Sequence, residues 1–343
     1  MNTAADQLKL FLRNQQVLVT GGTGSIGREI VASLLKHGAR KIVIFNKDDS
    51  KQYLLKQTYA GLPHVHFLLG DIRDYERVEF ATRGMDLIFH AAALKQVPIC
   101  EEHPFEAVKT NVLGSEHIIR ASIVNQVHKV VNISTDKAVN PTNTMGASKL
   151  LAEKLFSQAN QMLHPSRTRF CSVRFGNVLG SRGSVIPLFL HQVKAHKPLT
   201  VTDSRMTRFF MSIHQAAYLT LKAALYCSGG ETFILKMESL RLSDLCKAMS
   251  LFCKQEQLPE PHVQVIGVRP GEKLHEELLS VKEVRHLFED EELYVVYPPG
   301  LQQKDSQHFK PSAIQDYRSD QIQPATPRKL LAILNQYEQQ GKV

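Results

Sequence analysis

Short apolar runs alternate with longer amphipathic stretches along the first half of the chain. Six such runs, rich in β-branched residues, leucine and phenylalanine, lie at residues 16–20, 41–45, 65–69, 87–90, 130–134 and 170–175. A strand buried on both faces of a sheet is a nearly continuous apolar run, and strands that alternate with helices form parallel sheets. The pattern therefore predicts an α/β fold with a doubly wound parallel sheet.

Beyond residue 175 the pattern becomes less regular, and helices are the main elements that it still predicts. The helices expected along the whole chain are a short amphipathic one before Asn14 with Leu8, Phe11 and Leu12 as its apolar side, one from about residue 25 to His37, others near 104–125 and 143–160, one opening at Val185, and others near 213–226, 241–256 and 326–340. The acidic and then Tyr- and Pro-rich region after about residue 287 is expected to be irregular.

A glycine-rich turn follows the first strand and precedes the first long helix. Gly21, Gly24 and Gly27 have the spacing of a dinucleotide-binding turn, with Thr23, Ser25 and Ile26 between them. Glycines at these points allow a tight turn and a close backbone approach, so that a pyrophosphate can meet the N-terminus of the helix. The strand–turn–helix context makes nucleotide binding the favoured interpretation of a pattern that is weak by itself.

The ends of the next strands bear on which nucleotide binds. An acidic residue usually ends the second strand of an NAD site, but here Lys47 and Lys51 follow it, which favours NADP and leaves NAD possible. The alternative is that both lysines are only solvated. The remaining cofactor-side residues follow later strands: Asp71 and Ile72 on the adenine side, and the small Ala91 and Ala92, which admit the cofactor.

The fifth strand ends in a cluster of polar residues, Thr135, Asp136 and Lys137. Ligands of open α/β sheets bind beyond the carboxyl ends of the strands, so a hydroxyl, a carboxyl and an amine are expected together at a substrate site. In the helix that follows, Met145 and Lys149 lie four residues apart and therefore on one face.

Charge and cysteine content narrow the classes of function. The 343 residues carry a formal net charge of +9, but the lysines and arginines are scattered, so nucleic-acid binding is not expected. The five cysteines lack CxxC spacing, so no zinc site is expected, and their sparsity fits a reducing cytoplasm. No apolar run approaches the roughly 20 residues of a membrane helix, and no signal peptide is visible. Cys100 is expected to be a buried apolar residue, with a redox-sensitive thiol as the alternative.

A set of motifs from about Val17 to Leu279 gives the chain a specific resemblance. The motifs are TGGTGSIG, HAAALKQVP, EAVKTNVLG, STDKAVNPTN, MGASK, FGNVLGSRGSVIPLF, MTRFF and GVRPGEK. They resemble those of the nucleotide-sugar dehydratases of the extended short-chain dehydrogenase/reductase superfamily, and in particular the short UDP-N-acetylglucosamine 4,6-dehydratases. In this superfamily a tyrosine usually stands at position 145, where this chain has methionine, as do some members of the resembling group.

The resemblance implies bound NADP or NAD, a UDP-sugar substrate and a homo-oligomer, either a dimer or a higher form such as a hexamer. Its dimer faces would be the helices near 104–125 and 143–160. Lys149 would hold the nicotinamide ribose. The residues implied on the substrate side are Lys95, Thr135, Asn177, Arg205, Arg269 and Glu272. The domains expected are an N-terminal helix (1–14), a nucleotide-binding domain (15–178), a smaller substrate domain (179–300) with some elements returning to the sheet, and a C-terminal extension (301–343).

The implied reaction oxidises C4 of the sugar, removes the C5 proton, expels the C6 hydroxyl as water and returns the hydride to C6. Thr135 would bind the C4 oxygen, Asp136 would be the acid at C6, and Lys137 the base at C5. An unshifted lysine pKa near ~10.4 makes a neutral amine at pH 7 cost roughly 4.6 kcal/mol. Lys149 and a cationic nicotinamide are expected to lower the pKa of Lys137.

Met145 accepts no proton, so the base for the C4 hydroxyl is open between Lys137, Asp136 and a water relay. Two other functions stay open. One is a UDP-sugar C4 or C5 epimerase, and the other is a catalytically silent, NADP-binding regulatory protein.

Overall fold

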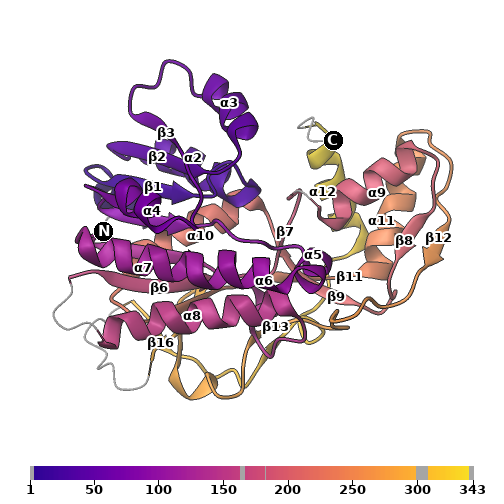
Figure 1. Cartoon of the computed structure of the whole chain (residues 1–343). Helices are drawn as coiled ribbons and strands as arrows, with labels where there is room; N and C mark the ends of the chain where they lie inside the picture. The colour runs from indigo at the N-terminus through magenta and orange to yellow at the C-terminus, as the bar shows by residue number, and fades with distance from the viewer. Residues whose placement is uncertain (1–3, 163–166, 182, 299–307, 340–343) are drawn as a thin grey trace.

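The chain folds around one large sheet. The computed structural model describes residues 4–162, 167–181, 183–298 and 308–339. Ten strands lie in the order β16-β14-β15-β10-β6-β5-β4-β1-β2-β3 (Figure 1). The strands from β10 to β3 are parallel, and their bounds are β1 Gln16–Thr20, β2 Lys41–Asn46, β3 Val65–Leu69, β4 Leu87–His90, β5 Lys129–Ile133, β6 Arg169–Arg174 and β10 Thr232–Leu235. The predicted α/β fold and its doubly wound sheet are confirmed.

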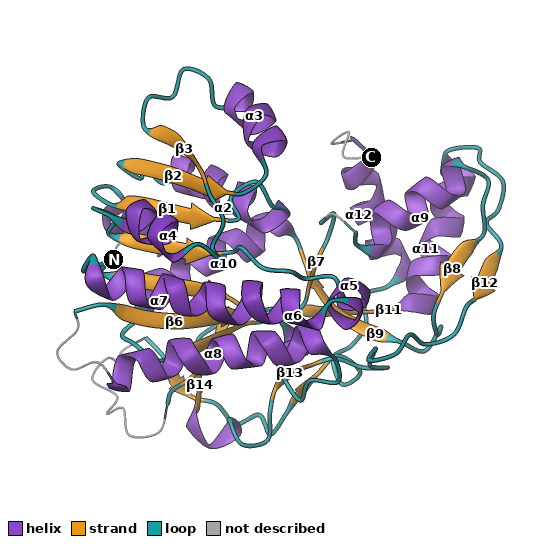
Figure 2. Ribbon diagram, in the orientation of Figure 1, coloured by secondary structure: helices purple, strands orange, loops and turns teal. Residues whose placement is uncertain are grey.

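Helices cover both faces of this sheet because successive strand residues point to opposite sides. In β1, Val17 and Val19 join the apolar cluster on one face, whereas Leu18 joins the cluster on the other. Helices α4, α7 and α8 lie in front of the sheet, and α2 and α10 lie behind it (Figure 2). Their bounds are α2 Ser25–Lys36, α4 Tyr75–Thr82, α7 Gly114–Val124, α8 Thr144–Met162 and α10 Ile213–Tyr226.

The N-terminal helix α1 (Ala4–Leu12) lies against α10. Leu8 and Leu12 are buried and Phe11 packs against the same core, as predicted for its apolar side. The predicted helix began at residue 1, and residues 1–3 lie outside the described part of the chain. Among the described residues, no helix is long and apolar enough to cross a bilayer.

The direction of the strand order changes between β1 and β4, which are neighbours in the sheet although β2 and β3 separate them in sequence. A crevice forms at such a switch point, outside the carboxyl ends of the strands. Thr20 and His90 are paired at these ends, so the turn that begins at Gly21 faces the segment that begins at Ala91. The sheet topology therefore places the glycine-rich turn at a ligand-binding position.

The expectation for the region after residue 287 was wrong. Among its described residues, β14 (Leu287–Glu289) and β15 (Leu293–Val296) extend the sheet with antiparallel pairing, and β16 (Lys310–Pro311) forms its edge. Leu293 and Val295 of β15 are fully buried, because alternate positions of this strand face the core. The helix expected near 104–125 is confirmed: α6 (Pro104–Ala107) continues through a π-helical segment at residues 108–113 into α7.

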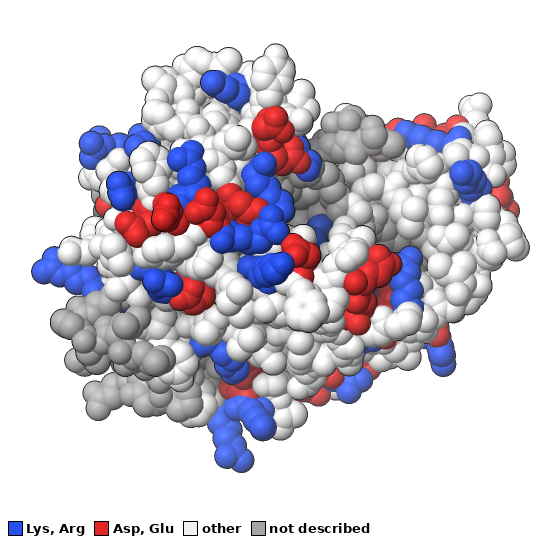
Figure 3. All heavy atoms as spheres, in the orientation of Figure 1, with Lys and Arg blue, Asp and Glu red and all other residues white. Residues whose placement is uncertain are grey.

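A second group of elements packs beside the sheet around its own apolar cluster, to the right in Figure 1. It contains α9 (Val185–Lys194), α11 (Leu242–Gln255), α12 (Pro327–Gln339) and the strand pair β8 (Leu199–Val201) and β12 (Val263–Val265). The surface is hollowed between this group and the part that carries α3 (Asp49–Thr58) (Figure 3). The expected domain boundaries stay a prediction, and residues 301–307 and 340–343 of the expected C-terminal extension lie outside the described residues.

Short strands connect the two groups of elements below this hollow. They are β7 (Asn177–Val178), β9 (Thr207–Met211) and β11 (Glu238–Arg241) in one small sheet, and β13 (Glu277–Leu279) with β17 (Tyr317–Arg318) in another. The segment that leads into β13 brings charged residues toward the end of β5.

A buried ion network fixes β13 to the main sheet. Arg174, the last residue of β6, is 2% exposed and donates to Glu153 of α8, with Nη2 2.7 Å from Oε2. Its guanidinium also donates to Glu283 at 3.0 Å and to the Leu278 carbonyl at 2.9 Å. Burial raises the pKa of the Glu283 carboxyl, but Arg174 outweighs this and lowers that pKa to about 2. One guanidinium thus joins a strand, a helix and the segment after β13.

Candidate functional site

The turn after β5 brings Thr135, Asp136 and Lys137 together. Asp136 is fully buried, and its Oδ1 accepts hydrogen bonds from Thr135 Oγ1 at 2.8 Å and from Lys137 Nζ at 3.0 Å. Its backbone N–H donates to the Phe175 carbonyl after β6. The other carboxylate oxygen, Oδ2, is buried and has no hydrogen-bond partner among the described residues. The three predicted residues therefore form one connected group at the carboxyl edge of the sheet.

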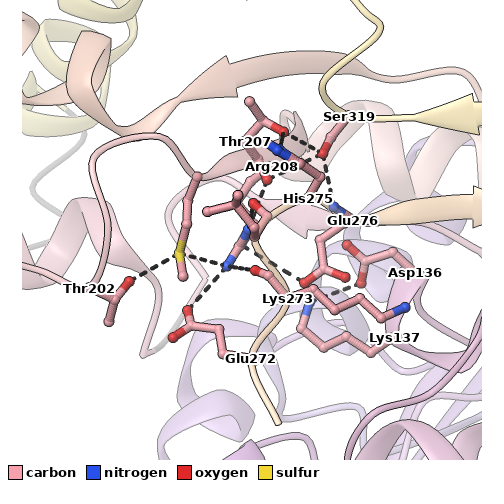
Figure 4. Close-up of polar contacts among 12 residues, drawn as sticks. Asp136, Lys137, Thr202, Thr207, Arg208, Glu272, Lys273, His275, Glu276 and Ser319 are labelled. Carbon is pink, nitrogen blue, oxygen red and sulfur yellow. Dashed lines mark hydrogen bonds and ion pairs between the residues drawn. The ribbon is translucent and has the colours of Figure 1, made fainter. Parts of the chain in front are cut away.

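A second carboxylate reaches Lys137 from the segment before β13. Glu276 is 2% exposed, and its Oε1 lies 3.3 Å from Lys137 Nζ and 3.9 Å from Arg208 Nε (Figure 4). Burial opposes the charge of the Lys137 amine, but Asp136 and Glu276 outweigh it and raise the pKa of Lys137 to about 12. The expectation of a lowered pKa was wrong for this structure, because the attraction of the two carboxylates exceeds the opposing effects of burial and of Arg208.

Arg208 of β9 organises the other side of the group. Its guanidinium donates to Glu272 Oε1 at 3.1 Å, to the Lys273 carbonyl at 2.9 Å and to the Leu274 carbonyl at 3.0 Å. These contacts bind the segment before β13 to β9. Neither Glu276 nor Arg208 was expected in the site. Arg208 belongs to the MTRFF motif and Glu276 lies three residues after the GVRPGEK motif, but only the fold shows that the two meet.

Met145 lies in an apolar setting at the start of α8. It is 4% exposed and clusters with Cys100 and Ala107, which are fully buried. Burial raises the pKa of the Cys100 thiol, in keeping with the expected apolar role. Lys149, one turn later, is 5% exposed, and burial lowers its pKa to about 8.

Gly146 explains how α8 can approach the turn after β5. A Cβ atom at this position would lie 2.2 Å from the Lys137 carbonyl oxygen, so only glycine permits the observed packing. The glycine of the MGASK motif therefore has a structural reason. Within the same helix, Ser148 accepts a hydrogen bond from Asn111 Nδ2 at 2.9 Å.

The glycine-rich turn makes a close backbone contact across the switch point. Gly21 has φ +66°, and a Cβ there would lie 2.7 Å from the Ala92 amide nitrogen. At Gly27, the first turn of α2, a Cβ would lie 2.4 Å from the Gly21 carbonyl oxygen. Thr23, Ser25 and Ile26 lie in this turn and at the start of α2, opposite the segment that begins at Ala91. This geometry fits a bound dinucleotide.

The residues proposed for the adenosine end are engaged with one another. Lys47 lies 3.8 Å from Asp71, and Lys51 forms an ion pair with Asp48. Asp71 also accepts two hydrogen bonds from Arg73, at 2.9 and 2.6 Å. Ile72, by contrast, is buried against Gly114. The Lys47 and Lys51 side chains remain 56% and 47% exposed, so they can still turn toward an anion.

The substrate-side candidates are spread more widely. Asn177 begins β7, next to the Gly176 backbone that covers Asp136, and Lys95 is exposed before α5 (Val97–Glu102). Arg205 is paired with Asp203 on an exposed turn, and Arg269 is exposed. Glu272 is joined to the Asp136–Lys137 group through Arg208, and the Arg269 backbone N–H donates to Glu272 at 3.4 Å.

Metal binding has no support among the side chains that the structure describes. Within them, no three or more His, Cys, Asp or Glu residues are grouped to hold a metal ion.

Comparisons with known proteins agree with this geometry. A family model described as polysaccharide biosynthesis protein matches residues 17–298. An inverting UDP-N-acetylglucosamine 4,6-dehydratase from Campylobacter jejuni is 39% identical over 290 residues, which cover 84% of this chain and 84% of that protein. A UDP-glucose 4-epimerase from Rickettsia bellii is 42% identical over 276 residues, 79% of each chain.

The X-ray structure of Pen from Bacillus thuringiensis has a TM-score of 0.90 and 39% identity to this chain, with 96% of this chain and 99% of that chain covered. The similarity extends over both the sheet and the smaller group of elements. The chain therefore belongs to the polysaccharide biosynthesis protein family of nucleotide-sugar dehydratases and epimerases, as its motifs predicted.

Proposed function

We propose that the protein is a UDP-N-acetylglucosamine 4,6-dehydratase that forms a UDP-4-keto-6-deoxy sugar for polysaccharide or glycan synthesis. The observation that carries the proposal is the Asp136–Lys137 pair after the end of β5, in which the partly exposed Lys137 Nζ lies 3.0 Å from Oδ1 of the fully buried Asp136. A dehydration needs both a base at C5 and an acid at C6, and general acid–base groups must lie within hydrogen-bond reach of the atoms they serve. An adjacent amine and carboxyl meet that requirement.

Thr135 and the two residues of the pair have separate tasks in this proposal. Thr135 binds the C4 oxygen, Lys137 takes the C5 proton, and Asp136 delivers a proton to the departing C6 hydroxyl. Because Lys137 Nζ donates a hydrogen bond to Asp136 Oδ1, a proton can pass from the amine to the carboxylate. A bound nicotinamide cofactor supplies the hydride chemistry at C4 and C6. Lys149, close to Met145 on α8, holds its ribose.

NADP is the proposed cofactor because β2 ends at Asn46 instead of an acidic residue. Lys47 and Lys51 follow this strand end, where a ribose 2′-phosphate would lie, and their side chains are 56% and 47% exposed, so they can leave their present partners Asp71 and Asp48. Titration of the purified protein with both nucleotides tests this. Tighter binding of NADP is expected, and tighter binding of NAD would contradict it.

Replacing Gly27 with alanine is expected to weaken nucleotide binding by more than about tenfold, or roughly 1.4 kcal/mol. The added Cβ would lie 2.4 Å from the Gly21 carbonyl oxygen, so the turn must open. Isothermal titration with NADP measures the loss. Lys36→Ala is the control, because Lys36 is an exposed residue at the other end of α2. Equal affinities of the two variants would contradict a nucleotide site at this turn.

A UDP-sugar 4-epimerase is the second candidate, because a relative with that name is 42% identical to this chain. The two reactions differ in mass balance: a dehydratase removes water from the sugar, whereas an epimerase leaves its mass unchanged. Mass spectrometry after incubation with UDP-N-acetylglucosamine separates them. Loss of one water from the sugar supports the dehydratase. An isomer of unchanged mass favours the epimerase, and no turnover with nucleotide bound favours the regulatory alternative.

Self-association is also proposed, through the face formed by α6, α7 and α8. These helices lie side by side (Figure 2) and expose large apolar residues. The exposed residues on this face are Phe105, Val108, Leu113, Val124 and Leu151. Phe105 is 79% exposed, which is costly for an apolar side chain of a monomer that displays several such neighbours.

The double variant Leu113→Glu/Leu151→Glu is expected to shift the protein to monomers in sedimentation velocity, while the unmodified chain forms dimers or larger species. Leu54→Glu is the matched control, because Leu54 is 63% exposed on α3, outside this face. A monomeric unmodified chain, or a double variant that stays oligomeric, would contradict this interface.

A further inference from the structure

The segment from Gly271 to Glu276 is bound to the loop that follows the catalytic turn. The Gly271 carbonyl accepts hydrogen bonds from Thr142 Oγ1 at 2.8 Å and Asn143 Nδ2 at 2.9 Å. Lys273 Nζ donates to the Val139 carbonyl at 2.7 Å. These contacts span more than 120 positions of sequence, with separations of 129, 128 and 134 residues. They hold the segment in place whether or not Glu276 contacts Lys137.

Glu276 is placed at the catalytic lysine at an energetic cost. It is 2% exposed, and its Oε2 is buried with no hydrogen-bond partner among the described residues. An unpaired polar atom in the interior is unfavourable, and an unpaired carboxylate oxygen especially so. Asp136 Oδ2 is likewise buried with no hydrogen-bond partner among the described residues. The Lys137 ammonium therefore lies between two buried carboxylates, each with one oxygen uncommitted (Figure 4).

The charged groups around Lys137 come from three elements. Asp136 belongs to its own turn, Glu276 precedes β13, and Arg208 projects from β9 with its guanidinium 3.9 Å from Glu276. Glu272 lies one contact further out, on Arg208. Arg208 works against a charged Lys137, whereas the two carboxylates favour it and raise the pKa of Lys137 to about 12 after burial has acted in the opposite direction. The lysine is therefore charged before substrate binds.

The charge of Lys137 matters because the proposed reaction moves protons off the sugar and back onto it. Two protons leave the sugar, one from the C4 hydroxyl and one from C5. Two are returned, one to the C6 hydroxyl as water leaves and one to C5. Met145 cannot hold either of them, and a charged Lys137 cannot accept a proton until it has released its own. The nearest described acceptors to its ammonium are Asp136 Oδ1 at 3.0 Å and Glu276 Oε1 at 3.3 Å.

We propose that Glu276 is a positioning residue that acts through Lys137: it orients the ammonium toward Asp136 and takes up the proton that Lys137 releases. With Glu276, the site holds two carboxylates, Asp136 and Glu276, for the two protons that leave the sugar. Glu276 thus supplies the proton capacity that a tyrosine at position 145 would otherwise supply. This inference rests on the proposed dehydratase function for its chemistry, but the contact between Glu276 and Lys137 can be tested without turnover.

The first test is competitive labelling of Lys137 with acetic anhydride across a range of pH, read by mass spectrometry of the Lys137 peptide. Only a neutral amine reacts, so each unit by which the pKa of Lys137 falls raises its labelling about tenfold at a given pH below that pKa. In Glu276→Gln, labelling is expected to begin at lower pH than in the unmodified chain. Glu276→Asp is expected to restore part of the difference.

Glu277→Gln is the matched control, because it makes the same change at the next residue, whose carboxylate accepts from Asn140 and does not contact Lys137. Equal labelling profiles for Glu276→Gln and Glu277→Gln would overturn the proposal. If Glu276→Gln does not fold, Glu276→Asp takes its place in the test. Its labelling profile must then differ from that of Glu277→Gln.

The second test is the pH dependence of kcat with UDP-N-acetylglucosamine. For Glu276→Gln, kcat is expected to fall more than about tenfold with KM little changed, and the basic limb of the profile is expected to move to lower pH. A profile identical to that of Glu277→Gln would overturn the proton-accepting role. If no variant turns over the sugar but the labelling shift is present, the dehydratase proposal fails while the positioning of Lys137 by Glu276 stands.

Discussion

Replacing Lys137 with arginine is expected to lower turnover of UDP-N-acetylglucosamine by about 10²–10⁴-fold, which is the usual contribution of a general acid–base group. A guanidinium keeps the positive charge that Asp136 and Glu276 surround, but it does not deprotonate in proteins. The substitution therefore removes the proton-transfer capacity of position 137 and keeps its electrostatic role. Steady-state kinetics give kcat, and nucleotide titration shows whether cofactor binding is retained.

Lys154→Arg is the control for this variant, because Lys154 is an exposed lysine of α8. Its turnover is expected to equal that of the unmodified chain. If Lys137→Arg also kept full turnover, a proton-transfer role for Lys137 would be excluded. Lys137→Met is a less informative change, because it leaves two buried carboxylates without their cation and so affects folding as well as chemistry.

Replacing Glu153 with glutamine is expected to lower the free energy of unfolding by about 3–5 kcal/mol, the usual cost of removing one partner from a buried ion pair. Arg174 would keep its charge at 2% exposure and would retain only Glu283 as a charged partner. Chemical denaturation followed by circular dichroism measures the change. Because Arg174 also holds the Leu278 carbonyl, the segment that carries Glu276 should loosen first.

The control is Glu116→Gln on the surface of α7, whose carboxylate pairs with Arg120 at 3.5 Å. An exposed pair of this kind contributes less than about 1 kcal/mol. Equal losses for Glu153→Gln and Glu116→Gln would contradict a structural role for the Arg174 network.

The same network predicts how stability depends on acid. The pKa of Glu283 is lowered to about 2 in the folded chain from an ordinary value of 4.5, so its contribution is complete above that ordinary value. This contribution should be lost progressively as the pH falls from 4.5 toward 2, where the unfolded chain binds the proton more readily.

The parallel strands of the sheet were predictable because a strand that is buried on both faces consists of a nearly continuous run of apolar residues. The strands at 16–20, 65–69 and 87–90 were found at the predicted residues. The strands β14 and β15 were missed, because they are short and lie in a region rich in acidic residues, tyrosine and proline. Their place in the sheet depends on pairing with β10, which no local pattern reports.

In the candidate site, too, a contact between sequence neighbours was predictable, whereas a contact between distant segments was not. Asp136 and Lys137 are neighbours in sequence at a strand end, so their meeting was foreseen. Glu276 lies 140 positions after Asp136, and its contact with Lys137 depends on how the segment before β13 crosses the loop after β5. The pKa of Lys137 was expected to be lowered by cationic neighbours, whereas the adjacent Asp136 and the distant Glu276 together raise it.

The most direct test of the dehydratase proposal is proton NMR of UDP-N-acetylglucosamine during incubation with the protein in deuterated water. A 4,6-dehydratase would give a new methyl signal from C6 and deuterium at C5, since C5 loses its proton to the enzyme and regains one from an exchanged site. Couplings to the substituents at C5 would show whether its configuration is retained or inverted. A changed configuration at C4 or C5 with the C6 hydroxyl still present would contradict the account and identify an epimerase.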